Sequence, residues 1–479
     1  MGASGLERRR HALAACLVAA FITGLDVSIV NVALPSIREQ LRATEVGLQW
    51  MLCGYALSFG LVLVPAGRLG DARSRRALFL AGVALFSLSS AVSGLAWSMS
   101  VVVAGRMVQG LAAGLLTPQV SGLIQQLFQG QERGRAFGAL GAALGISTTA
   151  GPLIGGVLVT VFGPEHGWRW VFLVNVPIGI ALLPVAWRVL PAPRPARAAG
   201  LGVRRRESMD PVGVGLLGVG VGGLLVPFIH QYQWEGNAEW LLIPVALVVL
   251  AVFVGWERTY RLEPLVDLTL FRRPSYNLGT VIALFYFAGF TGIFFTFTLY
   301  LQSGLHYSPL MAGLSITPFA LGSAGASVAG GRIVARAGPR LVVVGLSIVT
   351  VGLVATMAMT ELVPGRGVAL VTALPLLVAG IGSGLVISSN QVITLSEVPP
   401  AGGGSASGVL QTGQRLGTAM GNAAVGSMFF GSLRDGWPTA FRHGLLVVLV
   451  CVLIALAVAV YHLIQDLRAQ TSGWHRPAR

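Results

Sequence analysis

Residues 67–76 read GRLGDARSRR and residues 331–340 read GRIVARAGPR, so one arginine-rich pattern recurs 264 residues later in the chain. Each copy follows a mainly apolar stretch of about 20 residues, the length that a helix needs to cross a bilayer. The same offset carries Arg9, before the first apolar stretch, onto Arg273. We interpret the chain as two copies of a six-span unit in the same orientation, an architecture found among transporters.

The composition excludes a water-soluble fold. Of the 479 residues, 54% are hydrophobic and 11% are charged, whereas soluble domains average about 25% charged residues. Fourteen apolar segments are long enough to span a membrane. They are predicted near 11–34, 48–67, 77–97, 100–122, 136–162, 168–190, 210–230, 240–257, 275–302, 309–331, 340–360, 367–392, 403–432 and 441–463.

The arginines set the orientation of these spans. All 33 basic residues are arginine, and they lie in short runs between apolar segments, which argues against nucleic-acid binding. With the first arginine run in the cytoplasm, 25 arginines fall on the inside, 6 outside and 2 within spans, as the positive-inside rule requires. We therefore expect a multi-pass protein of the cytoplasmic (inner) membrane, with an even number of spans and both termini cytoplasmic.

These patterns give a domain organisation with two inserted helices. We expect an N-terminal six-helix bundle at 1–190, a cytoplasmic linker at 191–209 and two inserted transmembrane helices at 210–257. A C-terminal six-helix bundle at 258–463 and a cytoplasmic tail at 464–479 follow. The linker either lets the two bundles move or is only a solvated loop that obeys the charge rule.

One carboxylate stands out among the 18 acidic residues. Asp26 alone lies well inside a predicted span, and ionisable residues at such depth are functional by default. Arg106, in the fourth predicted span, lies at the same depth within about 3 Å at 1.5 Å per residue. The pair could serve proton coupling, could be a static ion pair, or could leave Asp26 to contact a cationic substrate. The position equivalent to Asp26 in the second copy is Phe290.

Four motifs resemble those of the major facilitator superfamily, and specifically its fourteen-span drug:proton antiporter branch. They are LDVSIVNVALP at 25–35, GRLGDARSRR at 67–76, RMVQG at 106–110 and GPLIGG at 151–156, the last followed by WRW at 168–170 and NVPIG at 175–179. The chain departs from the family pattern at Ala72, Ser74 and Ser147. The resemblance implies an all-α integral membrane protein with the major facilitator fold, in which two six-helix bundles have a parallel pseudo-twofold arrangement and two helices are inserted.

The resemblance also implies roles for two groups of residues. In the loop motif, Asp71 would lie at the N-terminus of the thirteenth span, near 402–407, and latch the outward-facing state; the charge rule alone explains the arginines around it. In the fifth-span antiporter motif, small residues would let helices approach closely and would seal the path against leak, or would only pack. The latch residues are Gly67, Arg68, Asp71, Arg73, Arg75 and Arg76. The antiporter-motif residues are Gly145, Gly151, Pro152, Gly155 and Gly156.

Polar and aromatic side chains on the apolar spans are candidates for a substrate cavity near the midplane, although any of them could instead be a helix contact. Aromatic and apolar walls with few polar groups suit amphipathic ligands. Arg415 also needs water, an acceptor or an anionic ligand. The candidates are Asn31, Tyr55, Gln109, Tyr286, Phe290, Phe294, Asn390, Gln411 and Arg415.

The preferred interpretation is a monomeric secondary transporter that exports amphipathic drugs, antibiotics or secondary metabolites by alternating access, with protons as the coupling ion. We expect no enzymatic activity, no cofactor and no metal, since no cysteine or histidine spacing suggests one. The phosphate-binding motif GxxxxGK[ST] requires a lysine, and the sequence contains none. This chain alone therefore does not use ATP through that motif. The alternatives are an importer or facilitator of a small polar solute, or a non-transporting membrane sensor or enzyme.

Overall fold

The computed structural model describes residues 3–191, 210–230, 238–260, 266, 268–363, 365, 367–399 and 402–473, and this part is helical and contains no strand. Its helices divide between two compact units. The first unit is 1–127, 150–268 and 398–412, and the second is 128–149, 269–397 and 413–479. The expected linker at 191–209 lies almost wholly outside the described residues.

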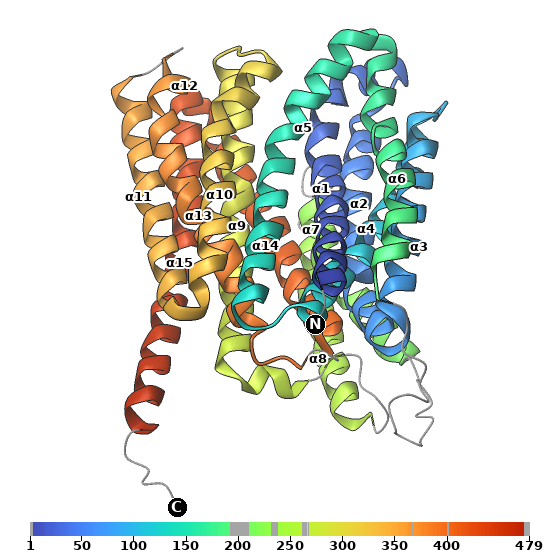
Figure 1. Ribbon diagram of the computed structural model, residues 1–479. Helices are drawn as coiled ribbons and strands as arrows, with labels where there is room; N and C mark the ends of the chain where they lie inside the picture. Colours follow the sequence, from blue (N-terminus) through green and yellow to red (C-terminus); the bar gives the residue numbers. More distant parts are fainter. Residues whose placement is uncertain are drawn as a thin grey trace, which may run out of the picture. The chain divides into compact units, whose positions relative to one another are not determined.

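The helices of the first unit run mostly antiparallel to their neighbours in sequence (Figure 1). They are α1 (Ala3–Gln40), α2 (Glu45–Leu69), η1 (Gly70–Ser74), α3 (Arg75–Gly94), α4 (Met99–Leu127), α6 (Asn175–Val189), α7 (Pro211–His230), η3 (Ala238–Leu241) and α8 (Leu242–Thr259). Helix α4 packs against α1, α2 and α3, and α6 packs against α1 and α3. The inserted helices α7 and α8 pack on each other, and α7 also contacts α2.

The helices of the second unit form another bundle. They are α9 (Pro274–Leu299), η5 (Tyr300–Gly304), α10 (Pro309–Ala337), α11 (Arg340–Leu362), α12 (Val368–Val371), α13 (Ala373–Thr394), η7 (Leu433–Asp435) and α15 (Trp437–Gly473), with η4 (Leu268–Arg272) at the boundary. Helix α13 packs against α9, α10 and α11, and α15 packs against α9 and α11. The core between these helices is apolar and aromatic, with Phe297, Phe319, Phe429 and Phe441 all buried.

Two long helices contribute to both units. Helix α5 (Gly130–Leu173) divides at residue 150 and α14 (Gly403–Gly431) divides at residue 413. The irregular backbone of α5 lies at Gly163, which has φ of 77°, a left-handed conformation that glycine adopts at little cost. The helix is kinked at Gly163, where two helical segments meet.

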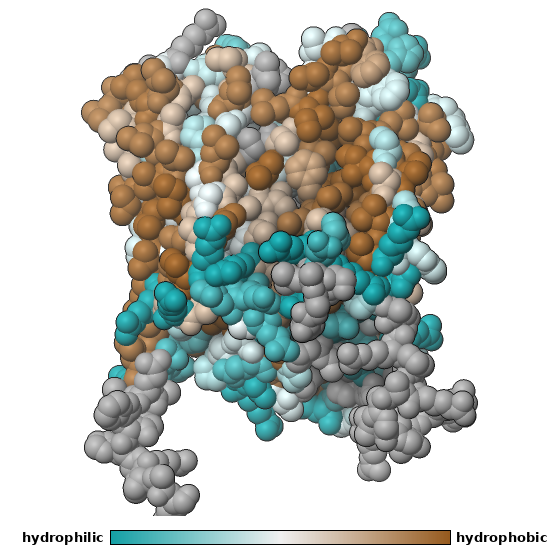
Figure 2. Space-filling model, viewed as in Figure 1, coloured by the Kyte–Doolittle hydropathy of each residue, from teal (hydrophilic) through white to brown (hydrophobic). Residues whose placement is uncertain are grey.

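Eleven helices in the described residues are long and apolar enough to cross a membrane. One of them, Trp50–Gly94, runs through two of the predicted spans, and the inserted segment Pro211–Leu224 is a shorter apolar helix. In Figure 2 hydrophobic residues cover most of the length of the helices in view, and hydrophilic residues gather at their lower ends. This is the surface of an all-α membrane protein; the number of fourteen spans remains a prediction.

The sequence did not predict the burial of two carboxyl groups at the ends of the inserted helices. Asp210, before α7, is 2% exposed, and Glu257, in the last turn of α8, is 4% exposed. Asp210 Oδ2 accepts a hydrogen bond from Trp256 Nε1 at 2.6 Å, and Glu257 Oε2 accepts one from the backbone N–H of Val266 at 3.2 Å. These bonds connect the beginning of α7 to the end of α8 and to the chain that follows it.

We expect Trp256→Phe to lower the free energy of unfolding by about 1–3 kcal/mol, because a buried acceptor loses a donor. The phenyl ring keeps most of the apolar contact, so the loss reports the hydrogen bond to Asp210. Thermal unfolding of the detergent-solubilised protein measures it. Trp97→Phe is the matched control, because Trp97 is 78% exposed. Equal melting temperatures for the two variants would contradict the prediction.

Candidate functional site

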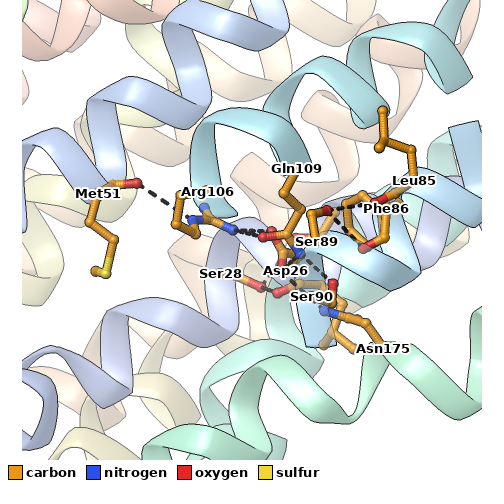
Figure 3. A network of polar contacts seen from close by, with 12 residues as sticks. Asp26, Ser28, Met51, Leu85, Phe86, Ser89, Ser90, Arg106, Gln109 and Asn175 are labelled. Atoms are coloured by element: carbon orange, nitrogen blue, oxygen red, sulfur yellow. Dashed lines mark hydrogen bonds and ion pairs between the residues drawn. The ribbon is translucent and has the colours of Figure 1, made fainter. Parts of the chain in front are cut away.

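A buried carboxyl group lies within α1 at Asp26, which is 0% exposed. Its Oδ2 accepts a hydrogen bond from Arg106 Nη1 at 2.5 Å, and the two side chains form an ion pair. Its Oδ1 accepts two more bonds, from Gln109 Nε2 at 2.8 Å and from Asn175 Nδ2 at 3.0 Å (Figure 3). Three donors around one carboxylate offset part of the cost of burying its charge.

The guanidinium of Arg106 is held by several groups at once. Arg106 is 2% exposed, and its Nη1 also donates to Gln109 Oε1 at 2.8 Å. Its Cζ lies 4.2 Å from the centroid of the Tyr55 ring, a distance at which a cation is attracted to the ring. Gln109 Nε2 donates onward to Ser90 Oγ at 2.6 Å. The polar groups thus form one connected network inside an apolar bundle.

Four helices of the first unit supply the hydrogen-bonded side chains of this network, and α2 adds the Tyr55 ring. Asp26 comes from α1, Ser90 from α3, Arg106 and Gln109 from α4, and Asn175 from the first turn of α6. Arg106 and Gln109 are three residues apart, so they share one face of α4. The contact between Asp26 and Arg106 is the one that their equal depths predicted. The sequence analysis did not select Ser90 or Asn175; the NVPIG motif was the available signal for Asn175.

A second carboxylate, Asp71, caps a helix. Its Oδ1 accepts a bond from the backbone N–H of Gly404 at 3.0 Å, and its Oδ2 accepts from Ser405 N at 2.8 Å and from Ser405 Oγ at 3.2 Å. Gly404 and Ser405 lie in the first turn of α14, within the first unit. The N-terminus of a helix favours an anion because its first N–H groups have no partner within the helix. Asp71 therefore lies at the helix N-terminus that the family resemblance implied, and its role as a latch stays a prediction.

The arginines of the loop motif differ in their surroundings. Arg75 is buried, and its Nη2 donates to Asp71 Oδ1 at 2.6 Å while its Nη1 donates to the carbonyl of Gly122 at 2.9 Å. Arg76 lies 4.4 Å from the ring centroid of Trp187. Arg73 is exposed, and Arg68 is half-buried. The charge rule thus explains Arg73, but Arg75 also has a structural function that the sequence analysis did not assign.

Two small residues of the same motif are explained by the structure. A Cβ at Gly67 would clash with the backbone of Gly404 and Ser405, so glycine lets the beginning of α14 approach α2. Ser74, where the family usually has glycine, caps α3 by accepting a hydrogen bond from Ala77 N at 3.1 Å. The departure at Ser74 therefore exchanges conformational freedom for a helix cap.

The comparisons with known proteins agree with this fold. The family model for the Major Facilitator Superfamily matches residues 16–422. The chain belongs to the Major Facilitator Superfamily. It is therefore a membrane transporter rather than an enzyme.

Relatives within the superfamily are named for antibiotic export. The chain is 35% identical to a probable actinorhodin transporter of Streptomyces coelicolor, over 89% of this chain and 73% of that protein. It is 32% identical to a tetracenomycin C resistance and export protein of Streptomyces glaucescens, over 91% of this chain and 79% of that protein. These relatives belong to the drug-efflux branch of the superfamily.

The solved structures of the superfamily confirm the fold alone. The proton:xylose symporter XylE is similar with a TM-score of 0.65 and 14% identity, covering 95% of each chain. The human organic anion transporter MFSD10 is similar with a TM-score of 0.66 and 16% identity, covering 94% of this chain and 99% of that one.

The antiporter motif of this superfamily member packs against α1 at two of its glycines. A Cβ at Gly151 would clash with the Ser28 side chain, and one at Gly155 would press on Ile29. At Gly145 a Cβ would make ordinary contacts with α10, and at Gly156 it would meet nothing within 4 Å. Close packing thus occurs at Gly151 and Gly155, and the described residues leave space beside Gly156.

Three of the candidate cavity residues make hydrogen bonds to other residues of the helices. Tyr286 Oη donates to Ser383 Oγ at 2.7 Å, and Asn390 Nδ2 donates to the carbonyl of Gly279 at 2.9 Å. Gln411 Nε2 donates to Ser407 Oγ at 2.8 Å. All three candidates are at least nine-tenths buried. The bonds of Tyr286 and Asn390 join α9 to α13, whereas the bond of Gln411 lies within α14. Their role in a substrate cavity stays a prediction.

The other cavity candidates differ among themselves. Tyr55 and Gln109 belong to the Asp26 network. Phe290 and Phe294 are half-buried and pack edge to face on each other, with ring centroids 5.2 Å apart. Arg415 lies half-buried on α14. The side chain of Asn31 lies outside the described residues. In the described residues no group of three or more His, Cys, Asp or Glu could hold a metal.

Removal of the Asp71 carboxyl group should weaken the first unit. We expect Asp71→Ala to lower the free energy of unfolding by about 2–4 kcal/mol, because a helix cap and the partner of a buried arginine are lost together. Asp71→Asn keeps the shape and one acceptor and should lose less. Thermal unfolding measures both, with Arg73→Gln at an exposed position as the control. A melting temperature for Asp71→Ala equal to that of the control would contradict the prediction.

Proposed function

We propose that this chain exports amphipathic antibiotics, drugs or secondary metabolites across the cytoplasmic membrane in exchange for protons. The relatives support the export of antibiotics: besides those named above, they include a puromycin resistance protein and a cephamycin export protein. The excess of arginine in alternate loops supports cytoplasmic termini. The chain acts as a monomer and needs no cofactor besides the proton.

The Asp26 network carries the proposal of proton coupling. Asp26 is fully buried, and Arg106 is the cation that contacts it. An arginine keeps its charge at any attainable pH. The pair therefore has two states: an ion pair when Asp26 is ionised, and a neutral acid beside a charged guanidinium when Asp26 is protonated. A single proton changes the interaction between α1 and α4 from one state to the other.

The same network supports a conformational response to the proton. Protonation of Asp26 removes the charge that attracts Arg106, while the bond from Arg106 to Gln109 Oε1 stays within α4. The bonds that connect α1 to α4 and α6 are the ones that weaken. Asp26 takes up its proton from the outside and releases it to the inside in each export cycle. The three donors on the Asp26 oxygens weigh against direct contact between Asp26 and a cationic substrate.

Aromatic side chains of the second unit supply the candidate substrate contact. Phe290 and Phe294 on α9 pack on Phe319 of α10, with ring centroids 6.0 and 5.4 Å from it. Aromatic rings offer large apolar area and favour edge-to-face contact with other rings. This surface suits the aromatic or apolar portion of an amphipathic molecule better than it suits a small polar solute, which would need more hydrogen-bonding groups.

The cap formed by Asp71 is the proposed latch of the outward-facing state. Its bonds to Gly404 and Ser405 must break whenever the beginning of α14 leaves the end of α2. The bond from Arg75 keeps the carboxylate oriented meanwhile. The antiporter glycines Gly151 and Gly155 hold α5 close to α1, the helix that bears Asp26, and support a sealed path around the proton site.

The proposed export can be tested in inside-out vesicles with an acidic interior. Compounds that appear in the names of the relatives, including puromycin and tetracenomycin C, are added outside. A pH-sensitive dye reports the pH of the vesicle interior. Export in exchange for protons releases protons from vesicles that contain the wild type. Vesicles without the protein are the control for leak. If correctly inserted protein releases no proton with any compound, while uptake of a polar solute proceeds, the importer alternative is favoured instead.

A further inference from the structure

The Asn175 side chain makes a single hydrogen bond in the observed arrangement, although its amide has two N–H donors and an acceptor oxygen. It is 0% exposed, and its Nδ2 donates to Asp26 Oδ1 at 3.0 Å. Its Oδ1 is buried and has no hydrogen-bond partner. Leaving a buried carbonyl oxygen unpaired costs free energy, so this oxygen needs an explanation.

Among the side chains bonded to Asp26, Asn175 has the acceptor oxygen without a hydrogen-bond partner. Arg106 has donors and no acceptor. Gln109 already uses both ends of its amide, because Oε1 accepts from Arg106 while Nε2 donates to Asp26 and to Ser90. When Asp26 is a neutral acid, its O–H needs an acceptor. The unpaired oxygen of Asn175 can be this acceptor, because Asn175 already contacts Asp26.

We propose that Asn175 turns its side-chain amide when Asp26 changes its protonation state. With Asp26 ionised, Asn175 Nδ2 donates to the carboxylate, as observed. With Asp26 protonated, rotation by half a turn brings Asn175 Oδ1 into the same place, where it accepts the O–H of the acid. Asn175 is thus a positioning residue that gives both states of Asp26 a hydrogen bond. This inference rests on the proposed function, in which Asp26 takes up the proton.

The surroundings of Asn175 permit this interpretation. In the described parts of α1, α3, α4 and α6, the charged groups that join the network are Asp26 and Arg106, and the others are neutral amides and hydroxyls. Gln109 is fixed by three bonds, whereas the Asn175 side chain has one. Rotation of Asn175 therefore breaks a single bond and makes a new one.

Infrared difference spectroscopy of the whole protein tests the rotation. The six asparagines are labelled with ¹³C at the side-chain carbonyl, and spectra at high and low pH are subtracted. We expect one amide carbonyl band to move to lower frequency on acidification, because the oxygen gains a donor. It should move in step with a protonated-carboxyl band that Asp26→Asn removes.

Two asparagine variants assign the band. Asn175→Leu should abolish the change in the amide band, whereas Asn390→Leu should leave it intact; Asn390 is also buried, and its amide bonds the carbonyl of Gly279. Should Asn175→Leu fail to fold, Asp26→Asn provides the second test, because it should also abolish the amide change.

The outcomes separate this inference from the proposed function. A carboxyl band that titrates and depends on Asp26, without any asparagine band moving, overturns the role of Asn175 and leaves proton uptake by Asp26 intact. The absence of any titrating carboxyl band assigned to Asp26 overturns both. An amide change that persists in Asn175→Leu assigns it to another asparagine and overturns the inference.

Discussion

Asp26→Asn should bind substrate and exchange it across the membrane but should release no protons. Asparagine has nearly the shape of a neutral aspartic acid, and it can still accept from Arg106 and form bonds within the network. It cannot gain or lose a proton. In inside-out vesicles we therefore expect substrate-driven proton release to fall to the level of vesicles without the protein, while exchange of labelled for unlabelled substrate continues.

Two further variants make this result specific. Asp435→Asn removes a carboxylate at an exposed position and should release protons as the wild type does. Asp26→Glu keeps a titratable group on a longer side chain and should retain part of the release. Proton release by Asp26→Asn at the wild-type rate would show that another group carries the proton and would leave Asp26 with a structural role.

The sequence predicted part of this site, because the position of a residue along its predicted span gives its depth in the membrane but not the helix face on which it lies. Asp26 was recognisable because a charged residue in an apolar span is rare, and Arg106 because its distance from the end of its span matched. The partners Ser90 and Asn175 were not recognisable, because serine and asparagine are common within and near membrane helices. Nothing in their spacing shows which face of α3 or α6 lies toward the network.

The same limit applies to the ends of the helices. Asp71 was placed at the beginning of α14 by resemblance to a family motif, and its bonds to Gly404 and Ser405 agree. Asp210 and Glu257 also lie near span ends, where water is the simple expectation, yet both are buried. Their burial depends on the packing of α7 on α8, and periodicity does not determine how two apolar helices are rotated against each other.

Glycine patterns show the corresponding ambiguity. The spacing of the glycines in α5 predicted close packing all along the motif, but a helix face meets its neighbour over only part of its length. Gly151 and Gly155 lie where α5 contacts α1, and a Cβ at Gly156 would meet no described residue within 4 Å. Fold class and the central ion pair could thus be predicted from the chain, whereas the partners that complete the network required the arrangement of helices.

Loss of Arg106 should destabilise the protein strongly, and loss of Asp26 at the same time should relieve much of this effect. Arg106→Met leaves the buried Asp26 without its cation, and breaking a buried pair from one side typically costs about 3–5 kcal/mol. In the Asp26→Asn background the same change leaves a neutral amide, so its cost should be smaller by about 1–3 kcal/mol. Thermal unfolding of the wild type, both single variants and the double variant measures this coupling.

Transport separates the structural role of the pair from its role in proton coupling. The double variant should recover stability relative to Arg106→Met, yet it should release no protons, because the network has lost its carboxyl group. Arg106→Lys keeps the charge but lacks the planar guanidinium that lies 4.2 Å from the centroid of the Tyr55 ring, so it should fall between the wild type and Arg106→Met in stability. Strictly additive costs in the double variant would show that the two side chains do not depend on each other. In that case the ion pair could not serve as the switch between the two states of the cycle.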